Sequence, residues 1–350
     1  MNDREKKARS FGSPDARALH EAYPAIDLHD DVLMWARWAG YDLAKRHRPP
    51  LPDNRWLGHV DLPRLREGGV GAQFFGLVSL PVFGHGGCFR AVDEQIDILD
   101  AFAAEHPDGM RKTRTAEGIE RANRDGAVAA LLGIEGAHAL EGDADRVGYF
   151  AGRGVRYLGL SHFSANATCF PAKGRGRDDS QGLTAFGREV VEACIASGVI
   201  VDLAHINKKG FMEACAICRV YGAPVIVSHT GVAGAHEHWR NIDDDQLRAV
   251  SSTGGVVGVI FVPNFLGGPG TEAVVKHLRH IVSVVGQDHA ALGSDYDGMV
   301  TPPADLADIS MLPNLTDALL GDRWSAELVG KVLRSNVLRV LRDTPVKENG

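Results

Sequence analysis

Six short apolar segments of this sequence end in an imidazole, a carboxylate or both. The residues at these ends are His29 with Asp31, Glu135, His162, His205, His229 and Asp295. Imidazole nitrogens and carboxylate oxygens are the ligands that Zn²⁺ and related divalent ions take from proteins. A single histidine after an apolar segment is usually a loop residue bonded to the backbone, but repeated coincidence points to one shared site. The pattern therefore predicts a metal centre.

The residue types indicate how two ions would be divided among these side chains. His29 and Asp31 are two positions apart, so on an extended segment their side chains leave the same face and can hold one cation. Glu135 has two carboxylate oxygens, which can bridge a pair of ions about 3.5–4 Å apart. His205 and His229 then hold the second ion.

Two more residues are expected to act on a substrate. Asp295 can take a proton from metal-bound water and pass it to a leaving amine. His162 can point an N–H at the oxyanion of a tetrahedral intermediate. Each residue has a plainer alternative, in which it only orients a metal ligand.

Strands alternating with helices would bring these residues together. Short apolar segments alternate with longer segments of helical period, which is typical of βα units around a parallel sheet. We expect eight strands, at 25–32, 70–79, 127–133, 155–161, 199–204, 224–228, 255–262 and 290–293. Eight such units close into a (β/α)₈ barrel, or TIM barrel, whose active site lies at the carboxyl ends of the strands.

The helical pattern and the loops define the domain organisation. The clearest helices are expected at 93–105, 184–197, 208–220, 244–252, 272–285 and 326–342. His277 and His280 lie beside the apolar face of the helix at 272–285 and are expected to be core or surface residues, not ligands. No linker rich in proline, glycine and serine divides the chain, so we expect an N-terminal extension over 1–24 and one barrel domain over 25–345. Long loops are expected at 41–59 and 163–182.

The composition excludes several classes of protein. With 44% hydrophobic and 24% charged residues among 350, the chain is neither disordered, nor a coiled coil, nor collagen-like. Its 38 Lys and Arg against 45 Asp and Glu leave a net charge of -7 and no basic face for nucleic acid. The polar N-terminus and the lack of a long apolar stretch predict a cytoplasmic protein that does not enter a membrane.

The cysteines and the remaining histidines receive plain interpretations. The five cysteines lack the spacing of a disulfide framework, and Cys215 and Cys218 lie in a helical pattern, so we expect buried thiols there and no zinc site. His85, His236 and His238 are expected to be exposed loop residues, with a place in the pocket lining as the alternative, and His289 precedes the last strand, at the end of the barrel away from the chemistry.

An ordered series of motifs carries a resemblance to a known family. The motifs include Asp27-Leu-His-Asp-Asp31, Gly133-Ile-Glu135, Tyr157-Leu-Gly-Leu-Ser-His162, Val201-Asp-Leu-Ala-His205, Pro224-Val-Ile-Val-Ser-His229, Arg240-Asn241 and Gly293-Ser-Asp-Tyr-Asp-Gly298. In these residues and their order the sequence resembles the membrane dipeptidase family, peptidase family M19 of the amidohydrolase superfamily, and especially its soluble bacterial members. The resemblance covers about 25–340.

The resemblance implies roles for individual residues. It implies two zinc ions, one held by His29 and Asp31 and the other by His205 and His229, with Glu135 bridging them. It also implies that His162 contacts the substrate near the scissile carbonyl, that Asp295 handles the proton, and that Arg240 binds the terminal carboxylate. A guanidinium suits that last role because it can give a carboxylate two parallel hydrogen bonds.

We therefore expect a zinc dipeptidase that hydrolyses dipeptides, including those with a C-terminal D-residue, through a metal-bridging hydroxide. One alternative is a metal-dependent hydrolase of another amide, an ester or a lactone, because fold and metal site do not fix the substrate. A second alternative is a non-catalytic metal-binding relative. The expected partners are a dipeptide and, by family precedent, a second copy of the chain in a homodimer.

Overall fold

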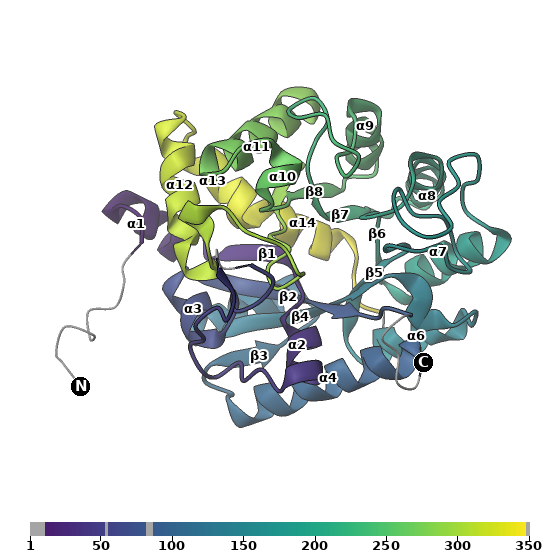
Figure 1. Cartoon of the computed structure of the whole chain (residues 1–350), viewed down its shortest axis with the longest axis horizontal. Coiled ribbons are helices and arrows are strands. Elements are labelled where there is room, and N and C mark those ends of the chain that lie inside the picture. The colour runs from purple at the N-terminus through teal and green to yellow at the C-terminus, as the bar shows by residue number, and fades with distance from the viewer. Residues whose placement is uncertain (1–10, 53–54, 82–86, 348–350) are drawn as a thin grey trace.

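A closed parallel barrel of eight strands forms the centre of the molecule (Figure 1). The structure is a computed structural model and describes residues 11–52, 55–81 and 87–347. The barrel strands are β1 (Ala25–Asp30), β2 (Val70–Val78), β4 (Val128–Glu135), β5 (Val155–Gly159), β6 (Ile200–Asp202), β7 (Ile226–Thr230), β8 (Val256–Val259) and β9 (Ala290–Leu292). Because β2 pairs with both β1 and β4, the sheet closes on itself. The predicted (β/α)₈ barrel is confirmed.

One strand lies outside the predicted eight. β3 (Met110–Lys112) pairs in parallel with the beginning of β4. Three residues are too few to show a strand period, so this strand could not be predicted from the sequence. The predicted strands all occur, each of them shorter at one or both ends than the apolar segment that predicted it, and β4 and β7 extend past the predicted carboxyl ends.

Helices surround the barrel on its outer side (Figure 1). They are α1 (Pro14–Ala22), α2 (Val32–Ala39), α3 (Leu62–Glu67), α4 (Cys88–Glu105), α5 (Ala116–Arg124), α6 (Asp145–Gly152), α7 (Ala185–Ser197), α8 (Lys208–Val220), α9 (Asp244–Ser252), α10 (Pro263–Leu266), α11 (Thr271–Val285), α12 (Leu312–Gly321), α13 (Ala326–Gly330) and α14 (Asn336–Asp343). Thr184, Asn207 and Asp243 cap α7, α8 and α9, each by accepting a hydrogen bond from a backbone N–H of the first turn. These caps explain why the predicted starts of the three helices lie within one residue of the observed ones.

The predicted helix at 326–342 is interrupted by a π-helical turn at Lys331–Ser335. At this turn Arg334 donates to the carbonyl of Pro24, and Asn336 donates to the carbonyl of Ala290. The interrupted segment is thereby attached to the amino ends of β1 and β9.

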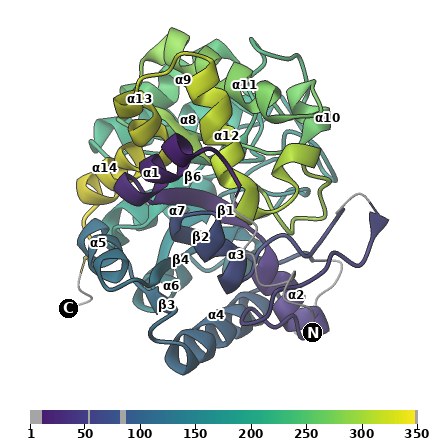
Figure 2. The ribbon, with the colours of Figure 1, turned by 90° about the vertical axis from the view of Figure 1, so that its left-hand side faces the viewer.

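The described part of the predicted N-terminal extension packs on the C-terminal helices. In Figure 2, α1 lies beside α12 and α13. Ser13 donates to Asp317 on α12, and His20 contacts the hydroxyl of Thr316 at 2.8 Å. These contacts attach the N-terminal segment to α12.

The barrel interior and its outer face form separate apolar clusters. Ile26, Leu28, Phe74 and Tyr157 belong to a buried cluster together with residues of α5 and α14. The strand residues of opposite parity belong to a larger cluster that packs against the surrounding helices. A strictly regular β1 would therefore direct His29 away from the side chains of Ile26 and Leu28.

Candidate metal centre and active site

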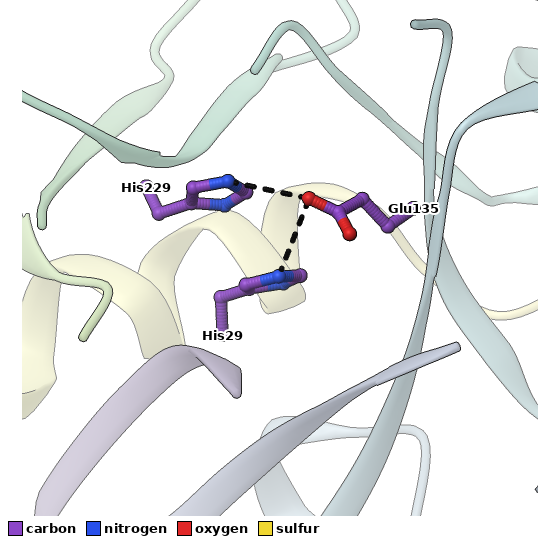
Figure 3. A group of neighbouring side chains, drawn as sticks. All are labelled: His29, Glu135 and His229. Atoms are coloured by element: carbon purple, nitrogen blue, oxygen red, sulfur yellow. Dashed lines mark ion pairs between the residues drawn. The ribbon is translucent and has the colours of Figure 1, made fainter. Parts of the chain in front are cut away.

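Three overlapping groups of buried side chains meet at the carboxyl ends of the strands. The groups are His29 with Asp31 and Asp295, His29 with Glu135 and His229, and Glu135 with His162 and His205. Nε2 of His29 and Nε2 of His229 lie 3.6 and 3.4 Å from Oε1 of Glu135 (Figure 3). Nε2 of His205 lies 3.1 Å from the same oxygen. The structure thus brings together the predicted ligands, His162 and Asp295, although they lie in or just after six different strands.

His29 and Asp31 are neighbours for a different reason than the spacing suggested. β1 ends at Asp30, and Asp31 has the non-extended backbone of the residue before α2, with φ −117° and ψ 23°. The two side chains therefore do not share one face of a strand. Instead, the pairing of β1 with β2 is irregular between Asp27 and Asp30, and such an irregularity re-aims side chains. His29 Nε2 consequently lies 3.3 Å from Asp31 Oδ1.

A second irregularity lies in β7, where the register with β8 shifts between Val227 and Thr230. His229 lies within this stretch, and its ring stacks on that of His29, with centroids 4.1 Å apart. His205 and Asp295 have positive φ angles of 66° and 63°. Such backbone is uncommon outside glycine and concentrates at functional sites.

Tyr157 crosses the barrel interior from β5 and contacts His29. Its hydroxyl lies 2.7 Å from Nδ1 of His29 and donates to the carbonyl of Leu28 at 3.1 Å. Since its one proton goes to Leu28, the phenol oxygen accepts from Nδ1–H, and the Nε2 lone pair of His29 is left for a metal. The ring lies against Gly133, where an added Cβ would be 1.9 Å from Cζ of Tyr157.

Ser228 and Asp202 hold the second imidazole in the same way. Ser228 donates to Oδ2 of Asp202 at 2.7 Å, and its oxygen lies 2.9 Å from Nδ1 of His229. The Ser228 hydroxyl therefore accepts from Nδ1–H, which leaves Nε2 of His229 to face the site. The sequence alone assigned no role to Tyr157, Ser228 or Asp202; the only signal was that each lies in a motif that ends at a predicted site residue.

The buried carboxylates of the site repel one another. Burial and the nearby Asp297 raise the pKa of Asp31 to about 8. Burial and the charge of Asp31 raise the pKa of Asp295 to about 8 and hold that of Glu135 well above its usual range. Cations bound among these groups would offset the repulsion between the carboxylates and lower their pKa values.

Three imidazoles of the site, those of His162, His205 and His229, are neutral. Burial lowers the pKa of His162 to about 3 and holds those of His205 and His229 well below the ordinary histidine range, with the positive Arg240 adding to the effect. Neutral imidazole is the form that binds metal ions.

The donor atoms fit a divalent metal. Within the described residues, buried Nε2 of His29 and Oδ1 of Asp31 have no hydrogen-bond partner. Leaving such atoms buried without a hydrogen bond is costly, and a cation would supply the missing partner. Mixed imidazole and carboxylate donors suit zinc and other first-row divalent ions.

A cavity of about 300 Å³ opens beside these groups and includes His162 and Arg240 in its lining. His162 Nε2 lies 3.5 Å from Oε2 of Glu135. The guanidinium of Arg240 is buried, donates to the carbonyl of His229 at 2.8 Å and lies 3.2 Å from Nε2 of His205. The positive charge of Arg240 therefore lies beside the imidazole and carboxylate cluster, where it can bind an anionic group of a ligand.

Comparison with known proteins decides the family. The sequence model of the membrane dipeptidase family, peptidase family M19, matches residues 14–349. This chain belongs to the membrane dipeptidase family.

Individual relatives of this M19 chain agree. It is 33% identical over 329 residues to the dipeptidase tcpJ of Claviceps purpurea, covering 91% of this chain and 76% of that protein. It is 27% identical to a solved M19 metallopeptidase, dipeptidase AC, with a TM-score of 0.81 over 92% of this chain and 98% of that one. A metallopeptidase from Rhodobacter sphaeroides, solved with a phosphinate mimic of the dipeptide L-Ala-D-Ala, is 26% identical, with a TM-score of 0.80 over 92% of this chain and 99% of that one. The predicted family and enzyme class are confirmed: the chain is a metal-dependent dipeptidase.

The remaining predictions concern residues outside the site of this M19 enzyme. Cys215 and Cys218 are buried thiols on α8, as expected. His277 is a buried core residue, and His280 is paired with Asp244 at 2.7 Å. His289 contacts the carbonyl of Gly255, next to the amino ends of β8 and β9. His236 and His238 are half-buried and not exposed as expected, and His85 lies outside the described residues.

Among the helices that the structure describes, none is long and apolar enough to cross a membrane.

Proposed function

We propose that this chain is a binuclear zinc dipeptidase that also accepts a D-residue at the C-terminus of its substrate. The observation that carries this proposal is the meeting of three imidazole Nε2 atoms at one carboxylate oxygen, Oε1 of Glu135, beside the cavity that contains Arg240. His29 and Asp31 would hold one ion, His205 and His229 the other, and Glu135 would reach both. Zinc bound there would polarise the scissile carbonyl and lower the pKa of a water molecule.

The side chains around the cavity would bind and orient the dipeptide. Arg240 would pair with its terminal carboxylate, because a guanidinium gives a carboxylate two parallel hydrogen bonds. His162, a neutral imidazole, would donate its N–H to the oxygen of the scissile carbonyl as charge develops there. Asp295 would take up a proton and deliver it to the leaving nitrogen.

The tolerance of a D-residue rests on a relative. The Rhodobacter sphaeroides metallopeptidase was solved with a mimic of L-Ala-D-Ala, and its fold superposes on 92% of this chain. We extend that stereochemistry to the present enzyme as part of the proposal.

A panel of dipeptides tests reaction and stereochemistry together. With zinc supplied, we expect hydrolysis of L-Ala-L-Ala and L-Ala-D-Ala, and a much higher KM for L-Ala-L-Ala amide, which lacks the carboxylate. The Arg240→Ala variant should lose this difference between free and amidated dipeptide. Equal KM values for the two in the wild type would contradict carboxylate recognition, and cleavage of esters or lactones but of no dipeptide would favour the alternative hydrolase.

A further inference from the structure

One wall of the active-site cavity is apolar and has no part in the proposed chemistry. It consists of Met34 on α2, Val78 and Leu80 at the end of β2, and Met299 and Val300 in the segment after β9. We call these five residues the apolar wall. Two aromatic side chains, Phe163 and Phe265, line the cavity elsewhere.

The part of the apolar wall at the end of β2 lies across the barrel mouth from Arg240. Around the closed sheet the strands follow the order β2, β1, β9, β8, β7, β6, β5, β4, so β2 and β7 are diametrically opposite. Arg240 follows β7, whereas Val78 ends β2. If Arg240 holds the carboxylate of the substrate, which is the proposed function on which this inference rests, the N-terminal residue extends toward the apolar wall.

The segment that carries Met299 and Val300 is fixed by hydrogen bonds. The carboxylate of Asp297 accepts from the backbone N–H groups of Gly58 and Val60, at 2.6 and 3.0 Å. The Asp297 carbonyl accepts from the indole of Trp35 at 2.6 Å, and the Val300 carbonyl accepts from the N–H of Trp56 at 2.7 Å. This part of the apolar wall is therefore attached to two other segments and presents a preformed surface.

The apolar wall offers no partner for a charged side chain. Among the described residues lining the cavity, the charged side chains are Asp31, Glu135, Asp295 and Arg240, and each already has a proposed role at the reacting bond or the carboxylate. A charged substrate side chain would lose its hydration against the apolar wall without gaining a counter-ion. An aliphatic side chain would instead lose unfavourable contact with water.

We infer that this enzyme selects dipeptides whose N-terminal residue carries an apolar side chain, such as Leu or Met, which lies against the apolar wall. A cavity of about 300 Å³ is at the small end for ligand pockets and suits a dipeptide. The choice among dipeptides then depends on the N-terminal side chain of the substrate, which would lie against Met299 and Leu80.

The first test compares kcat/KM for Leu-Ala, Met-Ala, Gly-Ala, Lys-Ala and Glu-Ala on the zinc-loaded wild-type enzyme. We expect Leu-Ala and Met-Ala to exceed Gly-Ala by about tenfold or more, since apolar groups in such pockets give discrimination of that size. Lys-Ala and Glu-Ala should lie below Gly-Ala. Equal values across the panel would overturn the inference while leaving the dipeptidase proposal intact.

The second test changes the substrate preference by adding one positive charge to the apolar wall. Met299 is 40% exposed and already has a non-glycine side chain at its positive φ of 58°, so Met299→Lys should fold. We expect the ratio of kcat/KM for Glu-Ala over Leu-Ala to rise at least tenfold in this variant. Val220→Lys, at an 82% exposed position on α8, is the matched control and should keep the wild-type ratio.

The outcomes separate the two proposals. An unchanged ratio in Met299→Lys would overturn the placement of the N-terminal side chain at the apolar wall. Failure of the wild-type enzyme to cleave any dipeptide, Gly-Ala included, would overturn the proposed function and this inference with it.

Discussion

Asp295 combines a buried carboxylate with a backbone conformation that few residues other than glycine adopt, φ 63°. Its pKa is raised to about 8 by burial and by the charge of Asp31. A group whose proton affinity is adjusted by its surroundings, next to a reacting bond, is suited to carry a proton. This residue therefore offers the most direct test of the proposed proton transfer.

Asp295→Asn should lower kcat for L-Ala-D-Ala by about 10²–10⁴-fold, because the amide cannot accept and release the proton. KM should change much less, and both ions should stay bound, since the five proposed ligands are unaltered. Steady-state kinetics and elemental analysis of the same preparation measure these quantities. Near-normal turnover with two ions bound would remove Asp295 from the proton path.

Tyr157→Phe should weaken zinc binding by about 10–100-fold, the usual cost of losing a group that orients a metal-bound histidine. The variant removes the oxygen that accepts from Nδ1–H of His29 while keeping the ring against Gly133. Competition with a chelator measures the affinity. Tyr41→Phe, which removes a hydroxyl bonded to the carbonyl of Val60, is the control and should bind zinc as the wild type does.

If Tyr157→Phe kept the wild-type zinc affinity, the phenol would have only a packing role.

At the scale of single residues the sequence could predict which side chains lie together at the site, because each ends an apolar strand. It could not predict Tyr157 or Ser228 as orienting groups, because their roles depend on which side chains meet across the barrel.

Strand ends and helix contacts set the geometry at the next scale. The eight barrel strands were predictable because each is an apolar segment between helical ones, and capped helices such as α8 were predictable to the residue. The irregular ends of β1 and β7 were not, because a period of two contains no information about register shifts. For the same reason the spacing of His29 and Asp31 correctly predicted that the two side chains are neighbours, but the extended segment assumed for them was wrong.

His277 on α11 joins the segment after β7 to α10 and makes stability depend on pH. Its Nδ1 accepts from the N–H of Val232, and its Nε2 lies 3.2 Å from the carbonyl of Leu266, so the neutral ring satisfies both. Burial lowers its pKa from 6.5 to about 4. As the pH falls, His277 is therefore protonated in the unfolded chain before it is protonated in the folded one.

The contribution of His277 is fully present above pH 6.5 and is lost between pH 6.5 and about 4, on the order of 3 kcal/mol in total. His277→Gln should make the free energy of unfolding less dependent on pH in this range. Denaturant unfolding at several pH values measures it. His289→Gln, at a half-buried position, is the control, and a His277→Gln curve parallel to the wild type would contradict the assignment.

The whole molecule is a barrel whose loops determine the shape of the cavity. The fold and family could be predicted because the succession of strands along the chain and the polar residues at their ends are visible in short stretches of sequence. The apolar wall could not, since it unites α2, the end of β2 and the segment after β9, whose contacts exist only in the closed barrel. Substrate preference is therefore a property of the assembled structure.

A zinc titration of metal-depleted enzyme tests the central claim most directly. The rate of L-Ala-D-Ala hydrolysis is measured as zinc is added to a known concentration of chains. The two-ion site predicts no activity without metal and a plateau at two zinc ions per chain. Full activity in the presence of a strong chelator, or a plateau at one ion per chain, would contradict it.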